Sequence, residues 1–335
     1  MLILGIDTSC DDTSASLLSI ENGRPSVITN VISSQSEIHT KYGGIVPELA
    51  SRRHIEMIVP VVAEALGSTR PEDLSAAAVC YGPGLIGSLL VGVSFAKSFC
   101  WAKKIPLVAV NHLEGHALAP FLEASPGFPY LCLVVSGGHT SIYKINDFAD
   151  YEELGRTRDD AAGEAYDKVA KLLGLEYPGG PKMDRLANEG NPKSIRFPRA
   201  YLPETFDFSF SGLKTAVVNH LVGLGDSAKP VGQEIARDVA ASFQAAVTDV
   251  LVRKCEWAIR QTGIRRLAIG GGVAANAGLK EKMTAMAKKH EIELFVPSPR
   301  YCTDNAAMIA FAGAKRFKNK QTAGPDLNAQ AYLPL

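Results

Sequence analysis

Short apolar runs bounded by turn residues open the chain. They cover residues 2–7, 13–20 and 25–33, and the turns Cys10–Asp12 and Asn22-Gly23-Arg24 separate them. Runs of this kind are typical of strands joined as hairpins. The pattern therefore predicts three consecutive strands at the start of the chain.

Helical spacing and strand-like runs alternate after this opening. Apolar residues recur near helical spacing from Val46 to Leu66, which predicts a helix there. The pattern then predicts a strand at 76–81, a long apolar helix at 85–102 and a strand at 107–110. This alternation is typical of an α/β fold.

The same order of elements returns in the second half. Strand-like runs at 129–137, 139–145 and 151–157 precede a helix at 232–261, and strand, helix, strand and a final helix follow between residues 265 and 318. We therefore predict an α/β protein of two duplicated lobes, 1–125 and 126–303. A C-terminal helix at about 304–325 would complete the first lobe, and an insertion rich in Gly, Pro and aromatic residues, at about 174–230, would extend the second.

Length and charge bound the function. A chain of 335 residues exceeds one ordinary hydrophobic core, so two domains are expected. The 35 basic and 35 acidic side chains give a net charge of zero, so RNA binding would need a local basic patch. Candidate groups, most of which are typically just solvated, are Arg52-Arg53, Lys103-Lys104, Arg265-Arg266, Lys288-Lys289 and Lys315-Arg316-Phe317-Lys318.

The cysteine pattern and the N-terminus indicate a cytoplasmic protein. The six cysteines are scattered and include no Cys-x-x-Cys pair, which suits a reducing compartment. Asp7 interrupts the apolar N-terminus, so we expect a strand there and not a signal peptide. No apolar run is long enough to predict a membrane span.

Two histidines at helical spacing carry the most chemical information. His112 and His116 lie four residues apart in the segment NHLEGH, so on a helix both imidazoles could bind one divalent metal. The order of residues argues against a His-Glu-x-x-His metallopeptidase, because Glu114 lies roughly 200° around the helix from His112. The alternative is that the histidines only cap a short helix.

Asp304 is the best carboxylate to complete such a site. It precedes the last predicted helix in the segment PSPRYCTDN and would face the cleft between the lobes if that helix returns to the first lobe. A His-His-carboxylate set with open positions suits Fe(II) or Zn(II). The alternative is an ordinary helix N-cap.

Glycine-bearing turns at strand ends are candidate phosphate sites. Residues 8–12 follow the first strand, Ser136-Gly137-Gly138-His139 occupies the equivalent place in the second half, and Gly82-Pro83-Gly84 and Gly270-Gly271-Gly272 lead into helices. Glycine lets backbone amides approach a phosphate, although one such turn alone is usually a plain tight turn. The spacings match neither the dinucleotide-binding fingerprint nor the P-loop. The matched set resembles the actin-like, sugar-kinase and Hsp70 ATPase architecture.

Aspartates cluster in the first of these turns. Asp7 could orient a hydrated metal or a phosphate-bound water, and Asp11 is a candidate proton acceptor, although turn formation is the commoner role for such residues. The polar, glycine-rich segments 161–174, 179–184 and 207–215 could form a pocket wall for ribose and adenine.

With these residues assembled, the chain closely resembles the bacterial TsaD family of tRNA N6-adenosine threonylcarbamoyltransferases, formerly named O-sialoglycoprotein endopeptidases. The matching segments run in order from residue 2 to about 318: GIDTSCDDTS, YGGIVPELASRRH, GPGLIGSLLVG, HLEGH, LVVSGGHTS, AAGEAYDKVAKLLGLEYPGGP, DFSFSGLKT, GGGVAAN and YCTDNAAMIA. The family often has Glu at the positions of Asp7 and Asp12, a difference that bears on fine positioning.

This resemblance implies a fold, a reaction and partners. The fold is that of the actin-like, sugar-kinase and Hsp70 superfamily, with two ribonuclease-H-like lobes and a cleft between them. The reaction transfers the threonylcarbamoyl group of threonylcarbamoyl-AMP to N6 of adenosine 37 in tRNAs that read ANN codons, and releases AMP. The implied protein partners are TsaB, a degenerate paralogue, and TsaE, a small P-loop ATPase.

The resemblance also implies site residues. The implied metal ligands are His112, His116 and Asp304, with Fe(II) favoured and Zn(II) possible. The implied substrate-binding residues are Val134, Val135, Ser136, Gly137, Gly138, His139, Asp167, Gly180, Asp184 and Asn276.

Two other functions stay open on the residues alone. An ATP-using kinase or regulatory ATPase of the same fold is possible because glycine turns do not exclude ATP. A non-catalytic scaffold would have no use for an intact His-His-Asp set.

The apolar helix at 85–99, with Gly87 and Gly92, could pack in the core or against TsaB.

Overall fold

The computed structural model describes residues 1–224 and 231–335, and the chain divides into two compact units. Unit 1 comprises Met1–Ser125 and Pro297–Leu335, and unit 2 comprises Pro126–Val296. The predicted insertion at about 174–230 lies in unit 2, and its residues 225–230 are outside the described part of the chain.

Unit 1 is built on a mixed five-stranded sheet with the order β3-β2-β1-β4-β5. The strands are β1 (Leu2–Asp7), β2 (Asp12–Glu21), β3 (Arg24–Ser34), β4 (Ala76–Gly82) and β5 (Leu107–Asn111). β1 pairs antiparallel with β2 and parallel with β4, which makes β1 the central strand. The three predicted N-terminal strands are therefore confirmed.

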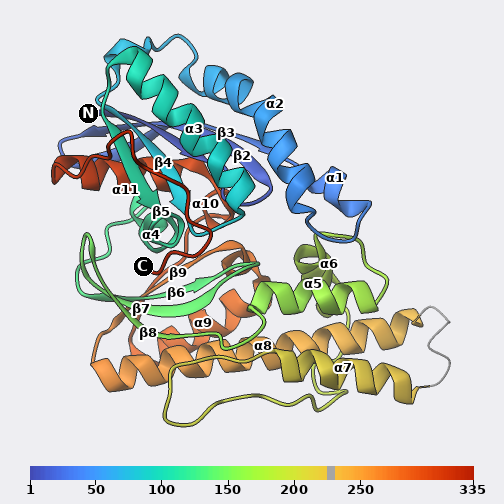
Figure 1. Ribbon diagram of the computed structural model, residues 1–335. Helices are drawn as coiled ribbons and strands as arrows, with labels where there is room; N and C mark the ends of the chain where they lie inside the picture. The colour runs from blue at the N-terminus through green and yellow to red at the C-terminus, as the bar shows by residue number, and fades with distance from the viewer. Residues whose placement is uncertain (225–230) are drawn as a thin grey trace. The chain divides into compact units, whose positions relative to one another are not determined.

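Helices cover both faces of this sheet (Figure 1). They are α1 (Ser36–Thr40), α2 (Pro47–Leu66), α3 (Ile86–Lys103), α4 (His112–Leu118), α10 (Pro299–Cys302) and α11 (Ala306–Lys318), with 3-10 turns η1 (Pro71–Asp73) and η2 (Ala119–Leu122). α2 and α3 pack on each other and on β2 and β4, whereas α11 packs on β1, β2 and β4. The helices predicted at 46–66 and 85–102 are thus confirmed to within a residue or two.

A glycine on the central strand lets α11 approach the sheet closely. A Cβ built on Gly5 would lie 2.3 Å from the carbonyl oxygen of Ala306 and 2.7 Å from the amide nitrogen of Ala310. Only a residue without a side chain fits such a contact. Gly5 therefore allows the first turn of α11 to pack directly against the backbone of β1.

Unit 2 repeats the strand order of unit 1, with the sheet β10-β9-β6-β7-β8. Its strands are β6 (Tyr130–Val135), β7 (Thr140–Asp147), β8 (Asp150–Arg156), β9 (Arg266–Gly270) and β10 (Glu293–Phe295). β6 pairs antiparallel with β7 and parallel with β9, as β1 does with β2 and β4. The duplication predicted from the order of elements is confirmed at the level of strand topology.

The helices of unit 2 include the longest in the described chain. They are α5 (Ala162–Leu172), α6 (Gly179–Ala187), α7 (Ser211–Gly223), α8 (Gln233–Thr262) and α9 (Ala277–His290), with the 3-10 turn η3 (Gly272–Ala275). The helix predicted at 232–261 corresponds to α8. No helix within the two described stretches combines the length and the apolar character that crossing a membrane requires.

Candidate metal centre and nucleotide site

The end of β5 sets the position of both histidines. Asn111 is the last residue of β5 and the N-cap of α4, where its side-chain oxygen accepts a hydrogen bond from the amide of Leu113 at 2.8 Å. The helix therefore begins at His112, and one turn later it carries His116. Both rings are buried, with their centroids 4.7 Å apart.

Asp304 meets both imidazoles from the other end of unit 1. Its Oδ1 atom lies 3.1 Å from Nε2 of His116 and 3.5 Å from Nε2 of His112. The N-cap of α11 is the next residue, Asn305, whose side chain accepts from the amide of Met308. The alternative of Asp304 as the cap is therefore wrong, and the helix begins two residues later than predicted.

The donor atoms fit a divalent metal. Metal–ligand bonds of about 2.0–2.2 Å place neighbouring ligand atoms roughly 3.0–3.5 Å apart, and both distances to Asp304 lie in that range. The Nδ1 atom of His116 is buried and has no hydrogen-bond partner among the described residues. The contact of Nε2 with Asp304 is therefore the polar contact that orients this ring. Two imidazoles and one carboxylate suit a first-row transition metal.

The electrostatics of the three side chains are those of two buried imidazoles beside a partly exposed carboxylate. Burial lowers the pKa of His112, but Asp304 and Asp7 outweigh it, so the pKa stands well above its usual value. Burial lowers the pKa of His116. Burial raises the pKa of Asp304, but His112 and His116 outweigh it and hold that pKa well below its usual value. A metal cation would take the place of the proton that His112 carries.

Glu114 points away from this cluster. Its side chain is 1% exposed, and its Oε2 atom accepts a 2.7 Å hydrogen bond from Nε of Arg316 on α11. The prediction that Glu114 lies on the other side of the helix is confirmed. Glu114 is therefore not placed to serve a metallopeptidase as a base beside the candidate metal site.

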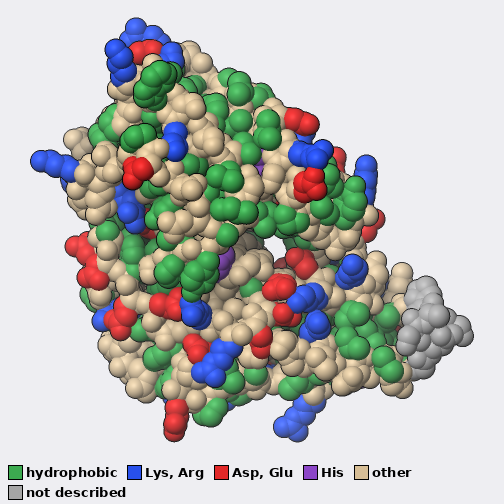
Figure 2. Space-filling view, in the orientation of Figure 1, with side chains coloured by type: hydrophobic (Ala, Val, Ile, Leu, Met, Phe, Trp, Pro, Cys, Tyr) green, Lys and Arg blue, Asp and Glu red, His purple; other side chains and the backbone are tan. Residues whose placement is uncertain are grey.

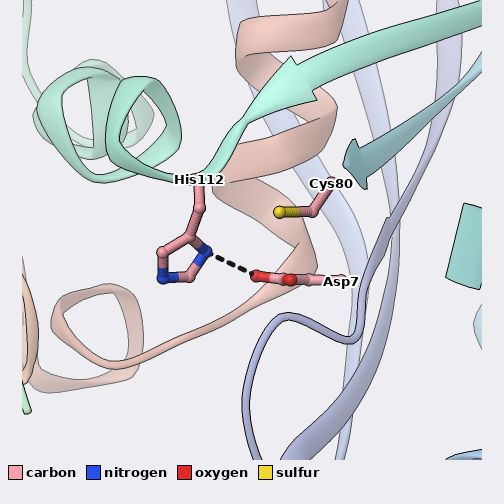
Figure 3. Close-up of side chains that lie close together, drawn as sticks. All are labelled: Asp7, Cys80 and His112. Atoms are coloured by element: carbon pink, nitrogen blue, oxygen red, sulfur yellow. Dashed lines mark ion pairs between the residues drawn. The ribbon is translucent and has the colours of Figure 1, made fainter. Parts of the chain in front are cut away.

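The aspartates after β1 lie close to the same cluster. Asp7 is buried, and its Oδ2 atom lies 3.3 Å from Nδ1 of His112 (Figure 3). Burial and then the charge of Asp11 raise the pKa of Asp12 to about 7. Cys10, between these residues in sequence, has its thiol pKa raised by burial and by Asp11, with a smaller effect from Asp304. Asp11 therefore lies in the same electrostatic neighbourhood as Asp304.

Unit 2 holds the predicted nucleotide residues, beginning with the turn after β6. Val134 and Val135 are fully buried at the strand end, so only their backbone groups could serve a ligand. The turn closes through hydrogen bonds from the Ser136 amide to the His139 carbonyl and from the His139 amide to the Ser136 hydroxyl. A Cβ on Gly137 or Gly138 would meet nothing within 4 Å, so this turn is open on one side.

Asp167 and Gly180 come together at the start of α6. The Oδ1 atom of Asp167 accepts hydrogen bonds from the amides of Gly179 at 2.8 Å and Gly180 at 3.3 Å. These amides therefore already have a partner. A Cβ on Gly180 would meet nothing within 4 Å, so this glycine contributes open space.

Asp184 and Asn276 come together in a second network, at the start of α9. Oδ1 of Asp184 accepts from the side-chain amides of Asn276 and Gln244, each at 3.0 Å, and Oδ2 accepts from the amide of Ala277 at 2.9 Å. Asn276 also caps α9 through the amide of Leu279. A carboxylate offers about four acceptor positions, so one remains for a ligand hydroxyl.

Gln244 is the residue of this network that sequence reasoning missed. It is buried on α8, and its Oε1 atom accepts from Asn276 at 2.7 Å and from the Tyr166 hydroxyl at 3.3 Å. The available signal was an amide inside the apolar stretch AASFQAAV. Buried polar groups are normally hydrogen-bonded, so such a residue points to a network.

Comparison with known proteins gives one consistent family. The family model described as TsaD, tRNA N6-adenosine threonylcarbamoyltransferase, matches residues 26–311. A protein of that name from Thermodesulfovibrio yellowstonii is 56% identical over the full length of both chains. A second, from Trichlorobacter lovleyi, is 54% identical and covers 93% of this chain and 91% of its own.

Solved structures of distant sequence share the fold. HypF from T. kodakarensis superposes with a TM-score of 0.63 at 14% identity, over 95% of this chain and 48% of its own. An activator of 2-hydroxyisocaproyl-CoA dehydratase from Clostridium difficile, solved with bound ADPNP, gives a TM-score of 0.54 at 15% identity over 96% and 97% of the two chains. The predicted two-lobed fold class is confirmed by these similarities.

Proposed function

Because the chain belongs to the TsaD family of tRNA N6-adenosine threonylcarbamoyltransferases, we propose that His112, His116 and Asp304 hold a divalent metal for this transfer. The enzyme transfers a threonylcarbamoyl group from threonylcarbamoyl-AMP to N6 of adenosine 37 in tRNAs that read ANN codons. The observation that carries the metal proposal is the convergence of two Nε2 atoms on one carboxylate oxygen inside unit 1.

The donor set favours Fe(II), with Zn(II) as the second choice. When bound, such a metal supplies a Lewis acid for the carbamoyl oxygen and a ligand position for the threonyl carboxylate or hydroxyl. α4 is buried along its whole length, whereas the Asp304 side chain is 24% exposed, so the site is open to a ligand beside Asp304. Burial strengthens the electrostatic interactions that position the donor.

We assign donor binding in unit 2 to the residues expected from sequence. The open turn formed by Ser136, Gly137, Gly138 and His139 would receive the phosphate of AMP through its backbone. The free acceptor position of Asp184 suits a ribose hydroxyl, and Asn276 and Gln244 hold that carboxylate in place. Gly180 leaves room for the base beside α6.

The transfer itself needs positioning more than a strong nucleophile. The donor is a mixed carbamic–phosphoric anhydride, so its carbonyl carbon is already activated. N6 of adenosine forms the new N–C bond, the C–O bond to phosphate breaks, AMP leaves, and N6 loses a proton. We propose that Asp11 or the donor phosphate accepts that proton.

Partners and location complete the proposal. We assign TsaB to the face formed by α2 and α3, where hydrophobic side chains spread over the surface (Figure 2) and Ile55, Val59, Ile86 and Leu90 are 42–64% exposed. The two helices lie close together there, as shown by Gly87, where a Cβ would lie 2.4 Å from the Ser51 hydroxyl.

TsaE and tRNA are proposed as further partners. A tRNA substrate and six free cysteines fit a cytoplasmic location.

The test is transfer of labelled threonylcarbamoyl to tRNA, with TsaB, TsaE and metal supplied. Wild type should form labelled tRNA, and His112→Ala should lose at least 100-fold in rate, on the order expected for loss of metal or electrostatic stabilisation. Labelled ATP that yields a phosphorylated product without threonylcarbamoyl would favour the kinase alternative. An unchanged transfer rate across pH in Asp11→Asn would remove Asp11 from the mechanism. If this chain and TsaB, purified together, form no complex, that result would count against the proposed TsaB-binding face.

A further inference from the structure

We propose that Asp7 is a positioning residue for the metal centre. Its carboxylate holds the proton of His112 on Nδ1 and so leaves Nε2 of that ring available to the metal. The inference rests on the metal site proposed above. Asp7 is not a member of the proposed ligand set, which is formed by His112, His116 and Asp304.

The geometry of Asp7 fits this role. Asp7 is the last residue of β1 and is 1% exposed. Its Oδ1 atom accepts a 2.9 Å hydrogen bond from the amide of Ser9, which fixes the plane of the carboxylate. Its Oδ2 atom has no hydrogen-bond partner of its own among the described residues and lies 3.3 Å from Nδ1 of His112 (Figure 3). One oxygen is therefore anchored and the other faces the ring.

The two nitrogens of His112 need different states. Nε2 faces Asp304, so it must present its lone pair if it is to bind a metal there. The ring proton then belongs on Nδ1, between Oδ2 of Asp7 and the hydroxyl of Ser9, which lies 3.1 Å away. The hydrogen bond of Nδ1 is with the Ser9 hydroxyl, which can donate or accept, so the negative charge of Asp7 3.3 Å away is what favours a proton on Nδ1. A carboxylate behind a histidine ligand also fixes its orientation and raises its basicity.

His116 provides an internal contrast. Its Nε2 atom faces the same Asp304 oxygen, but its Nδ1 atom has no partner among the described residues. Of the two histidines, only His112 therefore has a carboxylate beside its second nitrogen. We expect removal of that carboxylate to change the behaviour of one ligand and not of both.

Cys80 offers the competing explanation, a second metal site. Asp7, Cys80 and His112 place one donor atom each within 4.8 Å of one another (Figure 3). A metal there would need the Cys80 thiolate and the Nδ1 lone pair of His112, and Nε2 of that ring would then carry the proton and could not bind a metal beside Asp304. Oδ1 of Asp7 is also committed to the Ser9 amide. The geometry therefore favours a protonated Nδ1 next to Asp7 over a metal in that position.

Asp7→Asn is the sharp test, because it keeps the shape and removes the charge. If the Asn oxygen still accepts from the Ser9 amide, its NH₂ group faces Nδ1 and moves the ring proton to Nε2, where it blocks metal binding. We expect Co(II) titrated into the purified full-length chain, followed by calorimetry and visible absorption, to bind roughly 10- to 100-fold more weakly. The ligand-field spectrum of the bound Co(II) should also change. Asp7→Glu should restore part of the affinity, and Ser9→Ala should retain nearly all of it.

The outcomes separate this inference from the metal site itself. If wild type and His112→Ala bind Co(II) equally, the proposed metal site is wrong. If wild type binds Co(II) and Asp7→Asn binds with the same affinity and spectrum, the role of Asp7 is wrong. Two Co(II) per chain with a thiolate charge-transfer band that Cys80→Ala removes would also overturn it. Nitrogen NMR of the zinc-loaded wild type needs no variant, and a His112 ring without a proton on Nδ1 would contradict the proposal.

Discussion

At the scale of single residues, the chemistry depends on which side of a short helix each side chain occupies. His112 and His116 share the face of α4 that meets Asp304, whereas Glu114 faces α11 and pairs with Arg316. These three side chains lie within five consecutive residues, so a difference of two positions separates a proposed metal ligand from an anion that pairs with Arg316. Their distinct roles can be tested separately.

Replacement of Glu114 by Gln should affect stability and not metal binding. The substitution removes the buried charge that pairs with Arg316 while that guanidinium stays 26% exposed, so we expect a loss of about 2 kcal/mol in the free energy of unfolding. Urea unfolding of the metal-free chain measures it. Co(II) affinity should stay within about two-fold of wild type, whereas His116→Ala, a change two residues further along α4, should abolish tight binding. If Glu114→Gln lowered both the transfer rate and the Co(II) affinity, Glu114 would not have a purely structural role.

Asp12 should make the free energy of unfolding depend on pH. Burial first, and then Asp11, raise its pKa in the folded chain to about 7, above the value near 4 expected when unfolded. The folded state then binds the proton more tightly, so this contribution is complete below about pH 4 and is lost as pH rises through 7. Asp12→Asn cannot ionise. Its stability relative to wild type should therefore rise by about 2 kcal/mol between pH 5 and pH 8.

Denaturant unfolding at the two pH values checks this prediction. Asp12→Glu is the matched control, because it keeps an ionisable carboxyl at the same place and should keep most of the pH dependence. A difference between Asp12→Asn and wild type that is the same at pH 5 and pH 8 would show that Asp12 does not bind a proton more tightly in the folded chain.

At the scale of elements, close packing of α11 on β1 brings residues from opposite ends of the chain together. Asp7 ends β1, Asp304 lies two residues before α11, and Gly5 permits the approach. The periodicity of the sequence predicted both elements, and the spacing of His112 and His116 predicted the ligand pair. It did not reveal that Asp7 faces the second nitrogen of His112, because that contact depends on how the sheet, with β4 between β1 and β5, brings the end of β1 near the start of α4.

The same limit explains the irregular part of unit 2. The 30-residue helix α8 was predictable because its apolar positions recur over many turns. Residues 188–210 contain no helix or strand, and contacts such as Lys254 to the carbonyl of Leu202 hold them. Such contacts join residues far apart in sequence and leave no periodic signal. Gln244 was missed for a related reason, since its partners come from α6 and the start of α9.

Gly5→Ala tests the packing of α11. The added methyl would overlap the backbone of Ala306 and Ala310, so we expect a loss of about 3 kcal/mol or more in the free energy of unfolding. Asp304 should be displaced with the helix, so Co(II) affinity should fall as well. Gly223→Ala is the matched control, since a Cβ there meets nothing within 4 Å and its stability should change little. Wild-type metal affinity in Gly5→Ala would show that the approach of α11 does not set the position of Asp304.

At the scale of the whole molecule, one strand order has been used twice with different chemistry at the strand ends. Unit 1 has aspartates after its first strand and histidines after its fifth, whereas unit 2 has an open glycine turn after its first strand and a carboxylate–amide network at the start of α9. The duplication was predictable from the order of elements. The division of labour follows from which residue types occupy equivalent turns, so each ligand should act on its own unit.

Hydrogen–deuterium exchange on the full chain tests this division. The proposed metal site lies in unit 1, so Co(II) at about 100 times its dissociation constant should add up to about 2.7 kcal/mol of protection to peptides covering α4 and the start of α11. AMP should instead protect peptides that cover residues 134–139 and 179–184. His116→Ala should lose the protection that Co(II) gives and keep the protection that AMP gives, so this variant is the control for both ligands. AMP that leaves both unit 2 segments unprotected, at a concentration that inhibits transfer, would contradict the nucleotide assignment even if the metal site is correct.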